Sequence, residues 1–279
     1  MPELPEVEAV ARTLRPLVAG CRVRCVHVLH PIATRPQQPA ALAKRMEGRR
    51  IQGVGRHGKY LLLELDQGVA TLHFRLDGQL TWFSDFREFL RRANADESGV
   101  HVDVGFELDL GILGFADPRH FGRVQAWVSR EECAALRQLG VDALSRQFSF
   151  ELLAELLRSS RRPLKEFLLD QSKVAGLGNI YSSESLWRAK LDPRRPARSL
   201  KPREARLLHK AIVSVLRRAL ECCLHPAPDF REPQWWFLGL ERILRVYGRE
   251  GDECRRCGDP IQRIEQGGRS TYFCPRCQG

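Results

Sequence analysis

The first twenty residues carry apolar side chains at the spacing of an α-helix. Between Pro5 and Gly20 the apolar positions are spaced to fall on one helix face: Val7, Val10, Ala11, Leu14, Leu17 and Val18. Glu6 and Glu8 lie in the first turn, where carboxylates suit the helix dipole, and Gly20 follows as a stop signal. The pattern predicts a helix from Pro5 whose apolar face is anchored to a core.

From residue 22 to residue 128 the pattern changes to short apolar or β-rich runs. Residues 22–30 alternate, and further runs follow between Gly and Asp-Gly turn signals at 51–54, 60–65, 69–76, 79–83, 100–110 and 123–128. Many short strands without long helices between them indicate an antiparallel β-sandwich or barrel. The polar, irregular stretch 87–98 is predicted to be a surface loop.

After Trp127 the apolar periodicity becomes helical. Helices are predicted at 130–139, 149–159, 163–171, 180–189 and 203–223. A stretch rich in proline and aromatic residues follows at 224–240, before a short tail with four cysteines. We therefore expect an α+β fold with a leading helix and an antiparallel β-sandwich domain at 1–130, a helical domain at 131–240 and a tail at 241–279.

The charge balance of the composition adds a class of partner to this fold prediction. The chain has 279 residues, of which 43% are hydrophobic, so it can bury a full core. Forty-five Lys and Arg against 34 Asp and Glu give a formal charge of +11, which favours a polyanion such as nucleic acid, although a merely soluble basic protein has the same balance. No run approaches the ~20 apolar residues of a membrane span, and no signal peptide is recognisable, so we expect a cytoplasmic protein.

The four cysteines of the tail have the spacing of a zinc ribbon. Cys254-x2-Cys257 and Cys274-x2-Cys277 are separated by sixteen residues. Four thiolates leave no open position on a tetrahedral Zn²⁺, so we expect one structural ion. Because the tail is too short to form a hydrophobic core, zinc binding is expected to supply its folding energy. The remaining cysteines show no motif spacing and are expected to be reduced, largely buried thiols: Cys21, Cys25, Cys133, Cys222 and Cys223.

The start of the chain offers a nucleophile. Removal of Met1 would leave Pro2 with a free secondary amine beside the Glu3 carboxylate. An α-amino group titrates near ~8, well below lysine, so part of it is unprotonated at neutral pH. The positive end of the following helix would lower the pKa of this amine further. The alternative is that these residues merely begin a helix.

Two glycine-bearing turns offer sites for phosphate. Residues 171–181, Gln-Ser-Lys-Val-Ala-Gly-Leu-Gly-Asn-Ile-Tyr, place Asn179 at the start of a predicted helix, whose backbone amides form an anion site. Nearby basic residues point to a DNA backbone: Arg161, Arg162 and Lys173. Between the cysteine pairs, residues 267–271 are predicted to form a hairpin tip that presents Arg269, which alone could equally be a solvated turn arginine.

Five segments, in this order along the chain, form a specific combination. They are Pro2-Glu3-Leu4-Pro5-Glu6-Val7-Glu8, His57-Gly58-Lys59-Tyr60-Leu61, Asp117-Pro118-Arg119-His120-Phe121-Gly122, Gly176-Leu177-Gly178-Asn179-Ile180-Tyr181, and Gly267-Gly268-Arg269 with the zinc cysteines. Each is modest alone, but together they span almost the whole chain and resemble the formamidopyrimidine-DNA glycosylase family. Leu4, where the related endonuclease VIII branch typically has glycine, places the chain nearer the formamidopyrimidine branch, as does the Gly-Gly-Arg hairpin.

The resemblance implies a base-excision repair enzyme, a DNA glycosylase with AP lyase activity that flips a damaged base out of the duplex. Pro2 would attack the sugar C1′ and form a Schiff base, while Glu3 would act as the general acid that helps open the sugar ring. Lys59 and Arg269 would grip the phosphates that flank the lesion, with Asn179 beside them, and assist β- and δ-elimination.

The resemblance also implies the architecture and the partner. The helical domain would contain a helix-two-turn-helix motif and end in the zinc ribbon. The partner would be double-stranded DNA with a damaged base or an abasic site, bound by a monomer associated with the bacterial nucleoid in the cytoplasm.

By the same resemblance, three side chains would fill the hole left by the flipped base: Leu76, Arg119 and Phe121. Considered singly, Leu76 and Phe121 would be core residues. Leu76 replaces the methionine usual in the family, a volume-conserving change. His120 replaces the usual second arginine, so a permanent charge that would contact DNA becomes a pH-dependent one. Glu6 would lie in the base pocket or cap the first helix.

The main departure from the family lies between Glu221 and Gly239, where a glycine/threonine-rich loop usually closes over 8-oxoguanine. This chain has prolines and large aromatic residues there: Cys222-Cys223-Leu224-His225-Pro226-Ala227-Pro228-Asp229-Phe230 and Trp235-Trp236-Phe237. Such a segment is stiffer and offers fewer backbone donors, although its aromatics could instead be core residues. We predict that activity on formamidopyrimidines and abasic sites is kept, while the preference for 8-oxoguanine is altered.

Two alternatives stay open from the sequence. One is a specificity for oxidised pyrimidines, like that of endonuclease VIII. The other is a non-catalytic zinc-ribbon protein that only binds damaged or branched DNA, which needs none of Pro2, Glu3 and Lys59.

Overall fold

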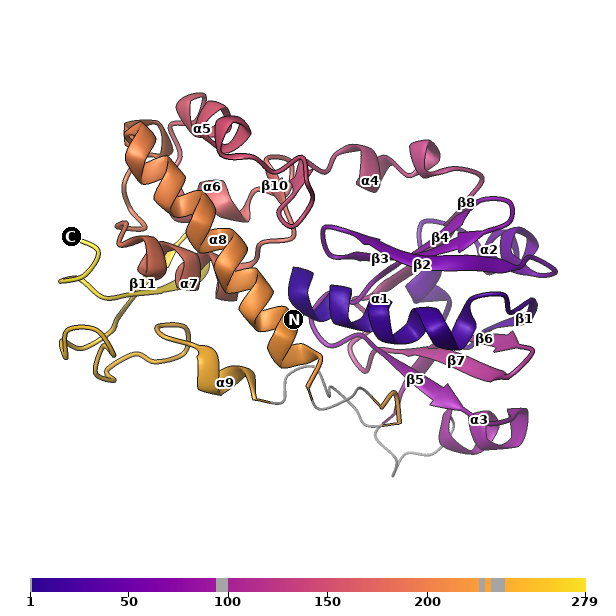
Figure 1. Ribbon diagram of the computed structural model, residues 1–279. Helices are drawn as coiled ribbons and strands as arrows, with labels where there is room; N and C mark the ends of the chain where they lie inside the picture. The colour runs from indigo at the N-terminus through magenta and orange to yellow at the C-terminus, as the bar shows by residue number, and fades with distance from the viewer. Residues whose placement is uncertain (1, 94–99, 226–228, 232–238) are drawn as a thin grey trace. The chain divides into compact units, whose positions relative to one another are not determined.

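The computed structural model describes residues 2–93, 100–225, 229–231 and 239–279, which form two compact units (Figure 1). The first unit contains the described residues up to Arg137 and those between 223 and 231, and the second contains Gln138–Cys222 and Gly239–Gly279. Strands predominate in the first unit and helices in the second. The predicted α+β class is confirmed, and the helical region and the cysteine-bearing tail fall in one unit.

The leading helix of the first unit, α1 (Leu4–Val18), begins one residue before the predicted start. Its apolar face is buried and packs on β2 (Ile51–His57) and β3 (Tyr60–Leu65). Leu17 is an exception among the apolar positions, because it is 43% exposed. Arg15 on α1 donates from Nε and Nη2 to the carbonyl oxygen of Val54 on β2, which fixes the helix against the sheet.

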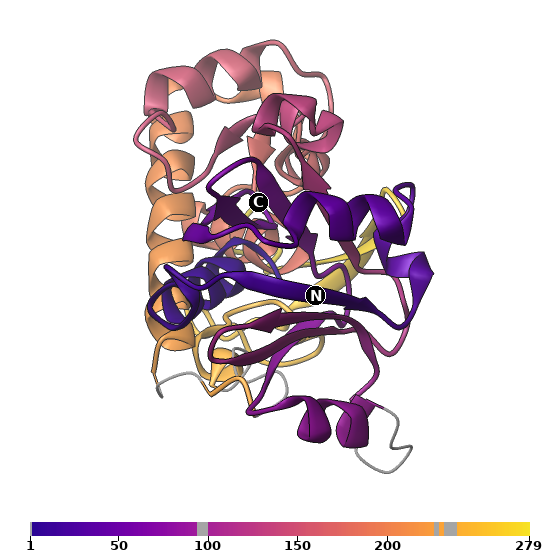
Figure 2. The same cartoon turned by 90° about the vertical axis from the view of Figure 1, so that its right-hand side faces the viewer.

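Two four-stranded sheets form the body of the first unit, and their strands can be followed in Figures 1 and 2. One has the order β1 (Val23–Val28), β6 (Val102–Leu108), β7 (Gly111–Ala116) and β5 (Gln79–Phe83). The other has the order β2, β3, β4 (Val69–His73) and β8 (Arg123–Trp127). All neighbouring strands in both sheets are antiparallel, which confirms the predicted sandwich.

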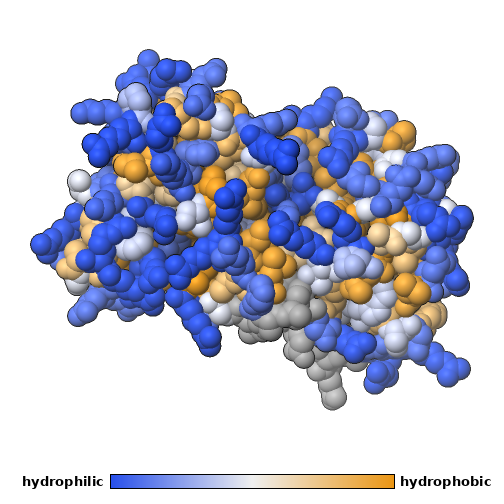
Figure 3. Space-filling model, in the orientation of Figure 1, coloured by the Kyte–Doolittle hydropathy of each residue, from blue (hydrophilic) through white to orange (hydrophobic). Residues whose placement is uncertain are grey.

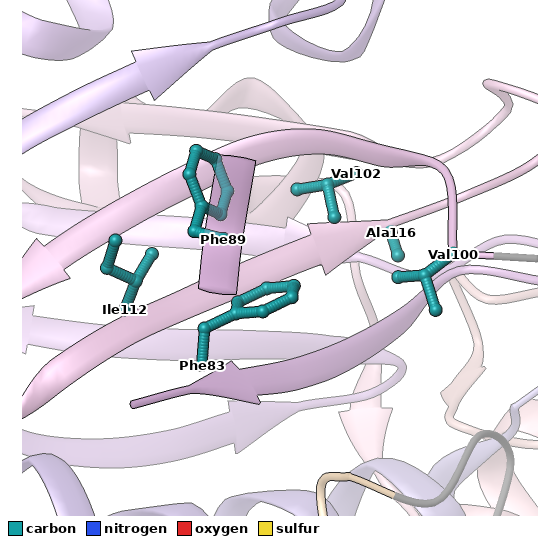
Figure 4. Packing of buried hydrophobic residues seen from close by; sticks show 6 residues of the cluster. All are labelled: Phe83, Phe89, Val100, Val102, Ile112 and Ala116. Carbon is teal, nitrogen blue, oxygen red and sulfur yellow. The ribbon is translucent and has the colours of Figure 1, made fainter. Parts of the chain in front are cut away.

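Two helices lie where none was predicted, α2 (Pro39–Met46) and α3 (Phe86–Ala93). The prediction of a loop at 87–98 is wrong as far as Ala93, because Phe89 on α3 is fully buried and meets the Phe83 ring edge-on at 5.4 Å. Figure 4 shows these two rings in a cluster with Val100, Val102, Ile112 and Ala116. A helix that covers the sheet with one face keeps a polar sequence on its other faces.

Other boundaries also differ from the prediction. The strand predicted at 100–110 corresponds to β6, which is shorter. The sequence analysis did not predict the glycine-containing β7 that follows it. A 3-10 turn, η1 (Pro31–Thr34), follows β1. In place of one helix at 130–139 the chain has η3 (Arg130–Glu132) and a short α4 (Ala134–Arg137).

The second unit is built from helices with two small sheets. Its elements are β9 (Val141–Asp142), α5 (Phe150–Arg158), α6 (Leu164–Leu169), β10 (Val174–Ala175), α7 (Asn179–Ala189), η4 (Ala197–Ser199), α8 (Pro202–Cys223), α9 (Leu240–Ile243), β11 (Gln262–Gln266) and β12 (Arg269–Phe273). The long α8, orange in Figure 2, buries apolar residues at helical spacing: Leu208, Ala211, Ile212 and Leu216. Leu207 is exposed and Val215 is only partly covered.

A buried carboxylate joins α7 to the C-terminal part of the second unit. Glu184 Oε1 accepts hydrogen bonds from the backbone nitrogens of Arg245, Val246 and Tyr247 at 2.9–3.0 Å. Burial raises the pKa of Glu184, and these backbone donors counteract part of that rise. α7 therefore depends on residues about sixty positions later in the chain.

Polar side chains cover much of the face shown in Figure 3, with apolar ones between them. Among the described residues, no helix combines the length and apolar character needed to span a bilayer. The proline- and aromatic-rich segment between Glu221 and Gly239, where we expect the chain to differ from the family, lies largely outside the described residues, at 226–228 and 232–238.

Candidate functional site

The N-terminal end of α1 carries Pro2 and Glu3. Glu3 is the N-cap residue and is 1% exposed, and Pro2 is also buried. The fully buried Glu6 carboxylate accepts a hydrogen bond from the backbone nitrogen of Glu3 at 2.8 Å, which is one half of a capping box. Glu6 therefore caps the first helix, one of the two roles expected for it. The cap fixes the backbone that bears both Pro2 and Glu3.

Lys59 lies in the two-residue turn between β2 and β3 and is 8% exposed. Its neighbour Gly58 has a φ of 57°, in the left-handed region that glycine adopts without strain. Arg56 donates from Nη1 to the Gly58 carbonyl at 3.0 Å and from Nε to Glu8 Oε2 at 2.9 Å. Since Glu8 lies on α1, this ion pair ties the Lys59 turn to the helix that follows Glu3.

The charges around this turn are set by its neighbours. Burial alone would raise the pKa of Glu8, but hydrogen bonds from Arg12 and the charge of Arg56 hold that pKa below its usual value. Burial lowers the pKa of His73 to about 3, and nearby positive charges, including that of Lys59, add to the effect. Glu8 is therefore an anion and His73 a neutral ring at neutral pH.

Two loops that cross between the sheets carry exposed apolar side chains. Residues 74–78 join β4 to β5, and residues 117–122 join β7 to β8. Because β4 pairs with β8 and β5 pairs with β7, both loops lie at the same end of the sandwich. Leu76 is 38% exposed and Phe121 is 48% exposed. The reading of either residue as core is therefore wrong.

Arg119 joins the two loops. It forms an ion pair with Asp77 of the other loop, and its guanidinium lies 5.5 Å from the centroid of the Phe121 ring. The fully buried Asp117 accepts hydrogen bonds from the backbone nitrogens of Gly122 at 2.5 Å and Arg119 at 3.1 Å. These contacts hold the second loop in one shape.

His120 lies in the same loop, with a φ of 53°. Its Nδ1 lies 2.6 Å from Oδ1 of the buried Asp103, and its ring centroid lies 4.7 Å from that of His30. Burial raises the pKa of Asp103 to about 6, although the neighbouring His120 counteracts part of that rise. Burial lowers the pKa of His30, and the two neighbouring histidines add to this.

In the second unit, the predicted glycine turn leads into α7 with Asn179 as its first residue. The side-chain nitrogen of Asn179 donates to the Ser270 carbonyl of β12 at 2.9 Å. From α6, the fully buried Lys165 donates to the Asn179 carbonyl at 2.8 Å and to Ser183 Oγ at 2.5 Å. Lys165 escaped the sequence analysis, and only its place in an otherwise apolar face of α6 could have marked it.

Arg269 is exposed at the start of β12. The turn before it, Gly267 and Gly268, has left-handed φ values of 55° and 72°, which confirms the predicted hairpin tip. Arg269 and Arg162 both line a surface hollow of the second unit. Arg161 is exposed beside Arg162. The second unit thus presents several arginine side chains to solvent near the hairpin.

The four tail cysteines meet at one point. Sγ of Cys254 lies 3.9 Å from that of Cys277, Sγ of Cys257 lies 3.4 Å from that of Cys274, and all four lie within 4.8 Å of one another. Zn–S bonds of ~2.3 Å place tetrahedral sulfur ligands roughly 3.8 Å apart, so the four residues fit a zinc ion. The indole nitrogen of Trp187 donates to the Cys254 sulfur at 3.5 Å.

The candidate residues divide between the two units. Pro2, Glu3 and Lys59 belong to the first, where α1 and the Arg56 ion pair connect them. Asn179 and Arg269 belong to the second, where the hydrogen bond from Asn179 to β12 connects them.

Known proteins match this chain along its whole length. Models of the formamidopyrimidine-DNA glycosylase N-terminal domain, of the formamidopyrimidine-DNA glycosylase H2TH domain and of a zinc finger found in FPG and IleRS match residues 1–124, 139–224 and 251–279. Formamidopyrimidine-DNA glycosylases of Thermus thermophilus and Pelotomaculum thermopropionicum are 43% and 38% identical, over 100% of this chain and 99% of each relative. The chain belongs to the formamidopyrimidine-DNA glycosylase family.

Solved structures of this family agree with the fold. Lactococcus lactis Fpg in complex with DNA that contains an abasic site has a TM-score of 0.86, with 31% identity over 99% of each chain. The same coverage and identity, with a TM-score of 0.87, are found for LlFpg with a THF-DNA and an inhibitor. The match to the family's zinc finger, together with the sulfur geometry, identifies the four cysteines as the ligands of a structural Zn²⁺.

Proposed function

We propose that this protein is a DNA glycosylase with AP lyase activity that removes oxidised bases from double-stranded DNA in base-excision repair. The observation that carries the proposal is the start of α1, where Pro2 and the buried Glu3 are held by the Glu6 cap. A protein that only bound DNA would need neither an amine nor a carboxylate fixed in this way. Full-length relationship to named formamidopyrimidine-DNA glycosylases supports it.

The proposed chemistry begins with Pro2 after removal of Met1. The nitrogen of Pro2 bonds to C1′ of the damaged nucleotide as the bond from C1′ to the base breaks, and the base leaves with that electron pair and takes up the proton that the Pro2 nitrogen loses. Glu3 donates a proton to the sugar ring oxygen, so the ring opens to an iminium ion. The iminium acidifies C2′, and loss of its proton expels the 3′ phosphate by β-elimination. The 5′ phosphate then leaves by δ-elimination.

The remaining residues would bind the DNA. Lys59, Arg269 and Asn179 would contact phosphates that flank the lesion, and the exposed Arg161 and the partly exposed His120 would add further backbone contacts. Exposed apolar side chains on the paired loops, with the arginine between them, suit the hole that a flipped base leaves: Leu76, Phe121 and Arg119. Such an enzyme would act on chromosomal DNA in the cytoplasm.

We further propose a division of labour among three segments. Residues 1–130 would supply the nucleophile, residues 131–240 the helix-two-turn-helix contacts to phosphate, and residues 241–279 the finger that presents Arg269. Formamidopyrimidines and abasic sites would be processed, whereas the proline-rich segment in place of the usual loop would change the preference for 8-oxoguanine. A panel of duplexes with each lesion, including oxidised pyrimidines, tests this; an ordinary preference for 8-oxoguanine opposite cytosine would contradict it.

Borohydride trapping on DNA with an abasic site tests the proposed nucleophile. We expect a covalent adduct with the processed protein and none when the amine of Pro2 is blocked, and an intact-mass measurement shows whether Met1 is absent. Because glycine also has a free amine, blocking is a cleaner control than Pro2→Gly. An adduct that survives blocking would assign the nucleophile to another residue.

Substitutions of the phosphate contacts have matched controls on the chain. Lys59→Met and Arg269→Ala are expected to reduce strand cleavage. Lys44→Met and Arg198→Ala remove the same charges from exposed sites on α2 and η4 and should leave cleavage unchanged. If the control variants lose as much strand cleavage as the test variants, the loss reflects the overall positive charge and not specific contacts of Lys59 and Arg269 with phosphate.

A further inference from the structure

A cluster of two histidines and one aspartate lies in the first unit, whereas the zinc ribbon belongs to the second. His30 follows β1, Asp103 lies on β6, and His120 lies in the loop after β7. One ligand atom from each of the three lies within 4.8 Å of those of the other two.

The carboxylate at the centre of the cluster has an unused oxygen. Asp103 is fully buried, and its Oδ1 contacts His120 Nδ1 at 2.6 Å. Its Oδ2 is also buried and has no hydrogen-bond partner within the part of the chain that the structure describes. A buried carboxylate oxygen left without a partner is costly, and a bound cation is one of the ordinary ways in which proteins satisfy it.

The backbone holds the three ligands in place before any ion binds. The backbone nitrogen of His30 donates to the Asp103 carbonyl at 3.1 Å, so the strand that carries the carboxylate also fixes the first histidine. The backbone nitrogen of His120 donates to the Asp117 carbonyl at 3.0 Å. His30 is exposed and 34% of the His120 side chain is exposed, so an ion could enter from solvent and keep positions open for water.

We propose that His30, Asp103 and His120 form a second metal site, which binds a divalent transition-metal ion of the Zn²⁺, Co²⁺ or Ni²⁺ class. Two imidazole nitrogens and one carboxylate oxygen are ligands that these ions prefer. Ca²⁺ and Mg²⁺ prefer sites made of oxygen alone and do not match this set. The buried carboxylate of Asp117 lies close by and adds negative charge that favours a cation.

Binding would affect the loop that carries Arg119 and Phe121. An ion bound through His120 would replace its contact with Asp103 Oδ1 and fix the imidazole of the residue that joins Arg119 to Phe121 in the chain. The site itself does not depend on the proposed glycosylase activity, because its ligands include none of the residues assigned to the reaction.

Metal titration of the tag-free, zinc-loaded protein tests the site. We expect Co²⁺ to add one equivalent per chain beyond the ribbon zinc, counted by elemental analysis, with visible absorption bands that lack the thiolate-to-cobalt charge transfer of a cysteine site. His30→Gln, Asp103→Asn and His120→Arg should each weaken this binding at least about tenfold. Thermal melting checks that each variant is folded.

Another cluster on the same unit provides the matched control. Cys25, His27 and Glu107 also lie within 4.8 Å of one another. His27→Gln should leave the second equivalent of Co²⁺ unchanged. The proposal is overturned if the zinc-loaded protein takes up no second ion, if uptake persists in His120→Arg and Asp103→Asn, or if His27→Gln abolishes it and a thiolate band shows that the ion is at Cys25. None of these measurements depends on DNA cleavage.

Discussion

The start of α1 and the paired loops 74–78 and 117–122 belong to the same unit but hold their candidate residues in opposite ways. Glu3 is 1% exposed, and Lys59 is 8% exposed beside a partly buried ion pair. Leu76 and Phe121 are 38% and 48% exposed. Residues proposed to perform covalent chemistry are thus supported within the protein, whereas those proposed to replace a base project into solvent because their partner is DNA.

The largest expected effect separates the two carboxylates at the start of α1. Glu3→Gln should lower the single-turnover rate of base removal by about 10²–10⁴-fold, the usual contribution of a general acid. Glu6→Gln should mainly weaken the helix cap, by about 1 kcal/mol, because Glu6 accepts the backbone hydrogen bond of Glu3. The rate of base removal and the melting temperature are measured for Glu3→Gln and for Glu6→Gln and compared. A similar rate loss in both would show that the cap and the acid act as one unit.

Removal of the zinc should be the next largest effect. With Cys257→Ala or a chelator the ribbon should unfold, since its ligands supply much of its folding energy. Arg269 would lose its position, and DNA binding should weaken at least about thirtyfold, or ~2 kcal/mol, as for a lost charged contact. Circular dichroism should retain the strand signal of the first unit. Full DNA affinity in the metal-free protein would contradict the role proposed for the finger.

Phe121→Ala tests the exposed side of the comparison. Because Phe121 is 48% exposed, its replacement by alanine should change the free energy of unfolding by no more than about 0.5 kcal/mol. Affinity for lesion DNA should fall about tenfold, since stacking of a base on an aromatic ring contributes ~1–3 kcal/mol. Leu110→Ala, at a residue 68% exposed in the turn between β6 and β7, is the matched control. An equal loss of affinity in the control would remove the special role of the loop.

Glu8→Gln should have the smallest effect and a characteristic pH dependence. The pair of Glu8 with Arg56, whose side chains are 20% and 7% exposed, should contribute about 1 kcal/mol of stability. Since the pKa of Glu8 is lower in the folded chain, this contribution is present above the unfolded pKa near ~4.3 and is lost as pH falls through the folded value.

Melting temperatures between about pH 7 and pH 3 test this dependence. Glu8→Gln should be less stable than the parent at neutral pH and converge with it in acid. Glu250→Gln, which removes an exposed carboxylate 56% open to solvent, should not converge in this way. A constant difference at every pH would mean that Glu8 acts through packing and not through its charge.

The sequence predicted those features that depend on local periodicity or fixed spacing. The leading helix, the antiparallel sandwich and the four zinc ligands are such features. α3 was missed because only one of its faces, with Phe89, is covered, and its other positions are polar. β7 was missed because two glycines, Gly111 and Gly114, weaken its strand signal.

The supports of the candidate site could not be predicted because they join residues far apart in the chain. Arg56 meets Glu8 across 48 positions, and Asn179 meets the carbonyl of Ser270 across 91. No motif spacing encodes such pairs. The roles proposed for Pro2 and Lys59 came from the family resemblance, and they stay predictions until the trapping and substitution experiments are done.

The hydrogen bonds of α7 have a consequence for synthesis on the ribosome. Synthesis of the sandwich strands is complete once Trp127 has been added to the chain. The hydrogen bonds of α7 can form only later, after Tyr247 has been added for the contact of Glu184 and Ser270 for the contact of Asn179. Domains generally fold as they emerge, N-terminal first. The sheets of the first unit can therefore form early, while the second unit is completed only when the last strand has left the exit tunnel and met its metal.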